Sequence, residues 1–282
     1  MAYNDALNYS KIFNMIGLSK TPNVLKNSNM LSRNIYAVKQ IDNINTKPDI
    51  SIDWTMGALV NKDGNFIDNL EVRSTASGIA HPADYKLLDN NIMRMNAGRH
   101  IQTVNGIPDL LLDYQGDFTM VYHGACLATG GISFLLTLVP TFGAIAGWVI
   151  KIDGTRYETV LGRISGHALS NSPSVPTTMP FSDLHTISFV YTEKYTATDS
   201  RLETYWDGIL VNSVENPYSP IRWNTGNNLY FGRFVNQLVN GVSFLADFKI
   251  FKRALSGGEM LDQHLNRPSP GFEFFQETKS RK

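Results

Sequence analysis

From about residue 48 onward, the chain is a succession of short runs in which apolar and polar residues alternate, separated by Gly, Asn, Asp and Pro. Side chains of an extended strand point alternately to two faces, so each run predicts a strand with one buried face. Ten or more such runs with almost no helical periodicity predict an all-β protein, a β-sandwich or jelly roll. The clearest runs are 50–60, 109–114, 117–127, 132–139, 144–152, 156–164, 185–192, 201–206, 209–214, 228–233 and 242–251.

Three Asp-Gly pairs, at 63–64, 153–154 and 207–208, stand between these runs. A type I′ turn needs a positive φ at both central residues, and Asp-Gly satisfies that need. Each pair therefore predicts a two-residue β-hairpin. In the second half of the chain, only residues 256–264 are predicted to form a helix.

One apolar segment has to be weighed as a membrane span. Residues 118–150 contain no Asp, Glu, Lys or Arg, and residues 132–150 are long enough to cross a bilayer. Pro140 interrupts the segment within a Pro-Thr-Phe-Gly cluster that is typical of a turn, and no Lys/Arg cluster flanks it. The segment therefore predicts two buried strands and no membrane span.

The charge balance restricts the partners of the chain. Lys plus Arg and Asp plus Glu both number 25, so the formal net charge is zero. Nucleic-acid binding needs a surplus of Lys and Arg, and so does binding to an anionic membrane surface, so neither is expected. The single cysteine, Cys126, lies in an apolar stretch and is predicted to be a buried, inert thiol that forms no intrachain disulfide.

Residues 1–46 differ from the rest of the chain. Tyr9, Phe13 and Ile16 follow helical spacing, and the segment after them is rich in Asn, Ser and Lys. We predict an N-terminal assembly arm at 1–46 (a short helix plus an extended segment), a β-sandwich at 47–268 and a C-terminal tail at 269–282. The first residues show no basic stretch followed by an apolar one, so no secretory signal is expected.

The last third of the chain carries an ordered set of motifs. An alternating strand at 185–191 is followed by ETYWDGILVNS at 203–213, NLYFGR at 228–233 and FLADFKIF with KRALSGGE over 244–259; GDFTM lies upstream at 116–120. In this order they resemble the laminin G-like domain, a concanavalin A-like jelly roll, over about residues 105–262. The motifs are structural, so the resemblance implies a fold and leaves the function open.

Patterns typical of enzymes are missing from the sequence. There is no closely spaced acidic series of the kind that glycan-cleaving jelly rolls use, no HExxH, no GxSxG and no phosphate-binding glycine loop. The six histidines are scattered without ligand spacing, and Asp109 and Asp113 are expected to be solvated strand ends. A non-enzymatic protein without a cofactor is therefore predicted.

The resemblance implies one candidate ion, calcium, because laminin G-like domains often bind Ca²⁺ at the rim of the sandwich through carboxylate and carbonyl oxygens of loops. Hard cations prefer such ligands. Asp153, Asp183 and Asp199 lie in predicted loops and are the candidate ligands, although solvated turn residues are the more common role for such aspartates.

Sugar binding requires an exposed aromatic face beside amide and charged groups. One long loop, 216–228, supplies Tyr218, Arg222, Trp223 and Asn224, and a second loop supplies Tyr195. The alternative for Trp223, a loop anchor packed on the sandwich, is the more common role for such a residue. The other tryptophans, Trp54, Trp148 and Trp206, lie within strand patterns and are expected in the core or on a sheet face.

The leading hypothesis is a non-enzymatic bacteriophage virion protein (a head-decoration, collar or tail-adhesin subunit) that displays a laminin G-like domain to surface glycans. Laminin G-like domains usually belong to proteins with leaders and often disulfides, and this chain shows neither. An arm so poor in apolar residues would hardly stay ordered alone, so it is expected to dock on other virion proteins, as a homo-oligomer or a docked subunit. The alternatives are a structural cement without sugar binding and a cellular carbohydrate-binding or adhesion module.

Overall fold

The chain divides into two units, Met1–Thr46 and Lys47–Lys282. The computed structural model describes residues 47–74, 80, 82–105, 116–127, 132–138, 148–153, 156–162, 168–171, 181–193, 200–216, 228–234, 237–238 and 241–279. The predicted arm, with Tyr9, Phe13 and Ile16, lies outside the described residues.

The described part of the second unit is mostly antiparallel strand, which confirms the all-β prediction. Two α-helices follow the last strand: α3 (Gly257–Leu265) and α4 (Phe272–Lys279). The strands are β1 (Ile50–Asp53), β2 (Ala58–Asn61), β3 (Phe66–Arg73), β4 (Tyr85–Leu88), β5 (Ile92–Met95), β6 (His100–Thr103), β7 (Phe118–Cys126), β8 (Ile132–Leu138), β9 (Trp148–Asp153), β10 (Arg156–Gly162), β11 (Ala168–Asn171), β12 (Phe181–Thr192), β13 (Ser200–Trp206), β14 (Ile209–Asn216), β15 (Leu229–Phe231), β16 (Arg233–Phe234), β17 (Gln237–Leu238) and β18 (Ser243–Phe251).

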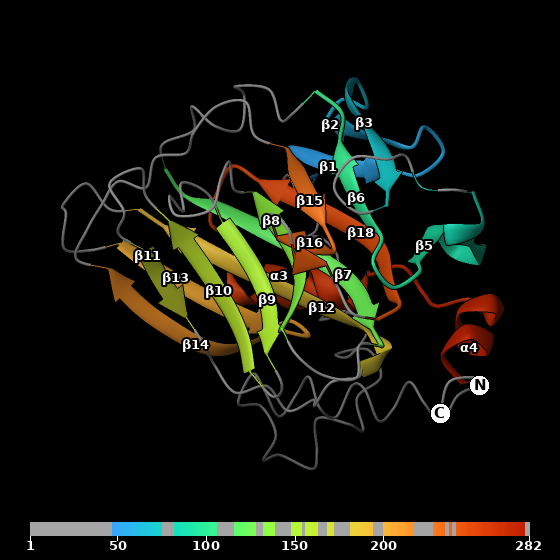
Figure 1. The fold of residues 1–282 in the computed structure, drawn as a ribbon. Helices are drawn as coiled ribbons and strands as arrows, with labels where there is room; N and C mark the ends of the chain where they lie inside the picture. Colours follow the sequence, from blue (N-terminus) through green and yellow to red (C-terminus); the bar gives the residue numbers. More distant parts are fainter. Residues whose placement is uncertain are drawn as a thin grey trace, which may run out of the picture. The chain divides into compact units, whose positions relative to one another are not determined.

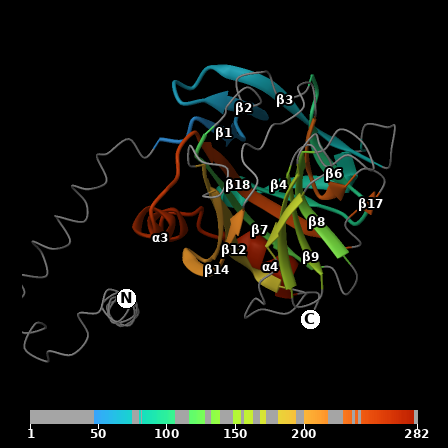
Figure 2. The same cartoon turned by 90° about the vertical axis from the view of Figure 1, so that its left-hand side faces the viewer.

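The strands form two layers, seen in Figure 1 and, turned by 90°, in Figure 2. Sheet A has the order β2-β1-β18-β7-β12-β13-β14, with the β4–β5 hairpin attached to β18. Sheet B has the order β11-β10-β9-β8-β15-β6-β3. Strand β3 connects them, because its first half pairs with β2 and its second half with β6. The buried Asp68 lies at this crossover and accepts hydrogen bonds from the backbone N–H groups of Asn69 and Asn105 (both 2.9 Å).

The main core lies between the sheets. Phe231 of sheet B meets Phe248 of sheet A edge to face, with ring centroids 5.1 Å apart, a favourable aromatic geometry. A smaller apolar cluster on the opposite face of sheet A lies under α3, whose Met260 is fully buried there. Strand β7 lies between the two clusters, which explains why all nine of its residues, Cys126 included, are buried.

The apolar segment at 132–150 contains two antiparallel strands, β8 and β9, as predicted. Within the described ranges, no helix is long and apolar enough to span a membrane.

The three Asp-Gly turns differ in outcome. At the β13–β14 turn, Asp207 and Gly208 have φ values of 51° and 76°, which confirms the two-residue turn. At 63–64 only Gly64 has a positive φ, and β2 and β3 are joined by residues 62–65, so the two-residue prediction was wrong there. The longer loop is stabilised by the Asn61 side chain, whose Oδ1 accepts from the backbone N–H groups of Asp63 and Asn65. The third pair includes Gly154, which lies outside the described residues.

The predicted helix at 256–264 is α3, and it begins with a capping box. Ser256 accepts from the backbone N–H of Glu259, whose carboxylate accepts from the backbone N–H of Ser256 in return. A second helix, α4, lies within residues 269–282, the segment predicted as a tail, and its Phe274 is fully buried against Phe244.

Candidate functional site

The face of sheet B opposite the core carries polar and aromatic side chains on three neighbouring strands. On β6, Ile101 is turned to the core, so the alternate residues His100 and Gln102 are turned to the other face. Residues paired across antiparallel strands share a face. Glu71 of β3 and Tyr230 of β15 both pair with Gln102, so one rung runs Glu71–Gln102–Tyr230 across the sheet.

The next rung adds Arg73, which pairs with His100, and Arg233 reaches the same group from β16. We call this set the polar row: Glu71, Arg73, His100, Gln102, Tyr230 and Arg233. The backbone turns sharply after Tyr230, because Gly232 has a φ of 84°, which glycine adopts without strain. That turn allows Arg233 to approach His100 with its Nη1 3.2 Å from Nε2.

The centre of the polar row is the fully buried His100. Its Nε2 lies 3.2 Å from Gln102 Oε1 and 3.2 Å from Arg233 Nη1, while its Nδ1 is buried and has no hydrogen-bond partner among the described residues. Burial lowers the pKa of His100 to about 4, and the nearby Arg233 and Arg73 guanidinium groups act in the same direction. The ring is therefore neutral at physiological pH, and its Nδ1 makes no hydrogen bond to a described residue.

The ends of the polar row are half-buried. Glu71 Oε2 accepts hydrogen bonds from Arg73 Nε (3.0 Å) and Nη2 (2.6 Å), so the two charges pair along the strand. At the other end, the Arg233 guanidinium lies 5.4 Å from the Tyr230 ring centroid, a cation–π distance. The side chains fix one another's orientation, and an aromatic ring lies beside carboxylate, amide, imidazole and guanidinium groups. Such a set can bind a molecule with many hydroxyls and an apolar C–H face.

A mostly apolar cavity of about 230 Å³ lies beside β3. It is lined by Trp54, Gly57, Leu70, Val72, Tyr85, Met93, Ile101 and Glu71, the last of which belongs to the polar row. This lining suits an aliphatic group rather than a molecule with many hydroxyls.

Trp54 lies where β18 changes partner. Strand β1 pairs with residues 249–250 of β18 and β5 pairs with residues 243–245, so the backbone between them faces neither strand. Trp54 Nε1 donates to the carbonyl oxygen of Ala246 at 2.8 Å and satisfies that group. The expectation that Trp54 and Trp206 lie in or against the core is confirmed, since Trp54 packs against it and Trp206 is buried.

The loops predicted to bind sugar lie outside the described residues. This holds for Tyr195, Tyr218, Arg222, Trp223 and Asn224, so both sugar-binding loops stay predictions.

The predicted calcium ligands are placed only in part. Asp153 is the last residue of β9 and Asp183 is an exposed residue of β12, so the loop positions expected for these two were wrong. Asp183 lies near the start of β12, where the pairing register with β7 shifts between Phe181 and His185. The local sequence pattern at such a break is that of a loop. Asp199 lies outside the described residues. No three His, Cys, Asp or Glu residues in the described part of the chain are grouped to hold a metal ion.

Three of the six histidines, although far apart in the sequence, lie close together in the structure. His123, His185 and His264 belong to one polar network around Thr186 and Asp207 at the edge of α3. Their separations in the sequence hide this. The strand register brings β7 beside β12, and it also places the β13–β14 turn beside Thr186 within β12. The polar row was missed for the same reason.

No protein-family model and no curated protein sequence matches the chain. Solved structures do match in fold. They include the receptor-binding domain of botulinum neurotoxin type G (TM-score 0.53, 14% identity, 78% of this chain and 51% of that chain). A structure of botulinum neurotoxin type C, whose cell entry depends on interaction with two ganglioside molecules, matches with a TM-score of 0.57 at 14% identity and covers 80% of this chain and 52% of that chain.

The binding domain of botulinum neurotoxin DC in complex with SialylT gives a TM-score of 0.57 at 12% identity and covers 79% of this chain and 52% of that one. The likeness is one of fold. This chain spans about half the length of these neighbouring structures. At such low identity the match shows a shared β-sandwich, and the laminin G-like assignment and the phage origin stay predictions.

Proposed function

We propose that the chain is a carbohydrate-binding module that binds surface glycans at the polar row. The observation that carries the proposal is the rung Glu71–Gln102–Tyr230 with His100 beside it, on the face of sheet B opposite the core. A pyranose ring offers an apolar face to Tyr230 and hydroxyls to the planar polar groups.

The neighbours in fold support the same class of ligand. The type C neurotoxin interacts with gangliosides and the DC binding domain is found in complex with SialylT, and both ligands carry sugars; another structure of the DC binding domain is in complex with rat synaptotagmin II. A β-sandwich hosts many functions, so the fold alone does not decide between them. The polar row is the reason to favour a glycan.

We also propose that the module is the outward part of a phage virion subunit, in which residues 1–46 form the assembly arm. Two features support this role: residues 1–46 are a separate unit, and the amphipathic spacing of Tyr9, Phe13 and Ile16 suits docking on another protein. Mass spectrometry of purified particles tests it. The chain is expected among the particle proteins at a fixed copy number, and its absence from washed particles would contradict the role.

A glycan array with the full-length chain tests sugar binding, run once with calcium and once with a chelator. The proposal predicts binding to bacterial surface glycans that survives the chelator, because the polar row contains no metal ligand set. Binding that needs calcium would turn attention to Asp153, Asp183 and Asp199. A blank array from folded protein would refute sugar binding and favour a structural cement.

Two variants on the same array locate the site. Glu71→Gln keeps the shape of the side chain and removes its charge, and it is expected to lower the signal about tenfold, about 1.4 kcal/mol of binding free energy. Trp223→Ala tests the loop predicted from the sequence, and a loss of binding confined to Glu71→Gln would place the glycan on the polar row. The reverse pattern would place the glycan on the loop.

A further inference from the structure

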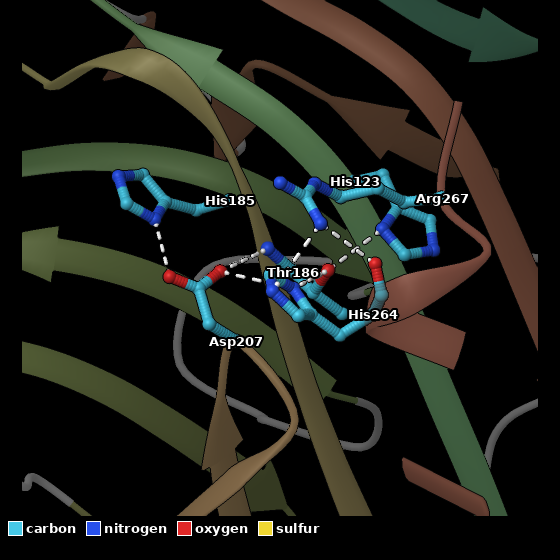
Figure 3. A network of polar contacts seen from close by, with 6 residues as sticks. All are labelled: His123, His185, Thr186, Asp207, His264 and Arg267. Carbon is cyan, nitrogen blue, oxygen red and sulfur yellow. Dashed lines mark hydrogen bonds and ion pairs between the residues drawn. The ribbon is translucent and has the colours of Figure 1, made fainter. Parts of the chain in front are cut away.

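Helix α3 is attached to the outer face of sheet A by a chain of polar contacts that Figure 3 shows from close by. The members come from β7, β12, the β13–β14 turn, α3 and the segment after it. They are His123, His185, Thr186, Asp207, His264 and Arg267.

The direction of the hydrogen bonds is fixed by Arg267. Its Nη1 lies 3.2 Å from His264 Nε2 and donates to the His264 carbonyl oxygen at 2.8 Å. A guanidinium can only donate, so His264 Nε2 must offer its lone pair and the ring proton must be on Nδ1. His264 Nδ1 lies 2.9 Å from Thr186 Oγ1 and 3.4 Å from Asp207 Oδ1, so it donates toward both acceptors.

The Thr186 hydroxyl connects His264 to His123. Its hydroxyl accepts from His264, so its own proton points to His123 Nδ1, 3.0 Å away. His123 therefore carries its proton on Nε2, which is fully buried and has no partner among the described residues. Asp207 accepts from the backbone N–H of Thr186 at 2.9 Å and lies 2.8 Å from His185 Nδ1. The whole arrangement requires His123 and His264 to be neutral.

The surrounding charges oppose protonation of both rings. Burial lowers the pKa of His123 well below its usual range, and Lys249 and Arg267 add to this. Burial also lowers the pKa of His264, with Arg267 acting in the same direction and Asp207 against it. The other charged groups that pack here are paired: Lys249 with Asp247 (3.0 Å) and, at the far end of α3, Arg253 with Glu259 (2.7 Å).

Other contacts also attach helix α3, which lies over the smaller apolar cluster of sheet A. Only Met260 and Gln263 of the helix are buried, and Lys249 Nζ donates to Gln263 Oε1 at 3.2 Å. The β13–β14 turn fits tightly against the helix, since a Cβ at Gly208 would lie 2.7 Å from Leu261 Cα. The polar network acts together with these contacts in holding α3 on the sheet.

We propose that this network is a pH-sensitive attachment, and that acidification releases α3 from sheet A while the two-layered core stays folded. A second proton on His264 would occupy Nε2 and face the Arg267 donor. A second proton on His123 would occupy Nδ1, the atom that now accepts the Thr186 hydroxyl proton. That hydroxyl would then have to turn its proton away from His123. Both new positive charges would lie near Arg267, and the charge on His123 would also lie near Lys249. The two histidines are therefore harder to protonate in the attached state than in the released state.

The pH dependence of helix release follows from the difference in proton binding between the attached and released states. An unperturbed histidine titrates near pH 6.5, so below that pH the released helix binds more protons than the attached one. Each such histidine makes release up to about tenfold more favourable for every further pH unit. Asp207 acts outside this window. Burial raises its pKa, but the hydrogen bonds from His185 and from the Thr186 backbone, together with the electrostatic effects of His185 and His264, outweigh burial and hold the pKa below the ordinary 3.8. Its contribution to stability is lost only at more acid pH.

Hydrogen exchange of the full-length chain between pH 7.5 and 5.0 tests the proposal, with rates corrected for the intrinsic effect of pH. The opening equilibrium of residues 255–267 is expected to rise up to about a hundredfold per pH unit below 6.5 if both histidines take up a proton. Strands β7 and β12 should keep their protection. Loss of protection in α3 and in both strands together would mean global unfolding and would overturn the proposal.

A pair of variants separates this attachment from general weakening of the helix. His264→Asn retains a donor near the position of Nδ1 and cannot be protonated, so the slope is expected to fall to about tenfold per pH unit. Arg253→Gln removes the arginine that precedes the helix and pairs with Glu259 in its first turn, and this variant should keep the wild-type slope, even if α3 opens more at every pH. Equal slopes in the wild type and His264→Asn would refute the role of the network.

Discussion

Replacing Phe274 by Ala tests whether α4 belongs to the core. The Phe274 side chain is 0% exposed and meets Phe244 edge to face at 5.0 Å, within the main cluster. Truncating a buried phenylalanine costs about 3–5 kcal/mol, from lost apolar burial and the cavity left behind. We take the lower end, about 3 kcal/mol, because a C-terminal helix can shift to close part of the cavity. For a domain of this size that loss lowers Tm by roughly 6–12 °C.

Calorimetry or circular dichroism during heating measures this change, and Phe275→Ala is the matched control. Phe275 is the next residue of the same helix, yet it is 41% exposed, with Lys279 5.9 Å from its ring centroid. Its truncation should cost less than about 1 kcal/mol. Equal losses from the two variants, or no loss from Phe274→Ala, would show that α4 is not packed into the core and would refute the reasoning.

Two further stability predictions follow from single contacts. Trp54→Phe removes the donor to the buried Ala246 carbonyl and should lower the free energy of unfolding by about 1–3 kcal/mol in chemical denaturation; a change within error would mean that water replaces the indole. Gly208→Ala places a methyl 2.7 Å from Leu261 Cα and should speed proteolysis around α3, whereas Gly64→Ala, whose methyl would have no atom within 4 Å, should not. Both glycines have a positive φ, so equal effects would point to turn strain alone.

The parts of the fold that were predictable from the sequence are those with a strong local signal. Long alternating runs gave β7 and β14, the Asp-Gly pair gave the turn at 207–208, and the Ser256–Glu259 spacing gave the start of α3. Helix α4 was missed because only Phe274 and Thr278 of its eight residues are buried, so its apolar spacing is weak.

The candidate sites depend on register, which no local pattern contains. Strands β3 and β6, which carry four members of the polar row, were not among the predicted strands, and β6 has only four residues. Four residues are too few for alternation to stand out. Glu71, Gln102 and Tyr230 come together only because two non-consecutive strands flank β6, and His123 and His264 meet only across the sheet and helix.

The most direct test of the account is the affinity of the full-length chain for its best array glycan, measured by calorimetry for Tyr230→Ala and Tyr85→Ala. Both tyrosines are half-buried, and only Tyr230 lies in the polar row, while Tyr85 lines the apolar cavity. The account predicts at least about tenfold weaker binding for Tyr230→Ala, about 1.4 kcal/mol, and unchanged binding for Tyr85→Ala. Unchanged binding by a folded Tyr230→Ala protein would contradict the assignment of the glycan to the polar row.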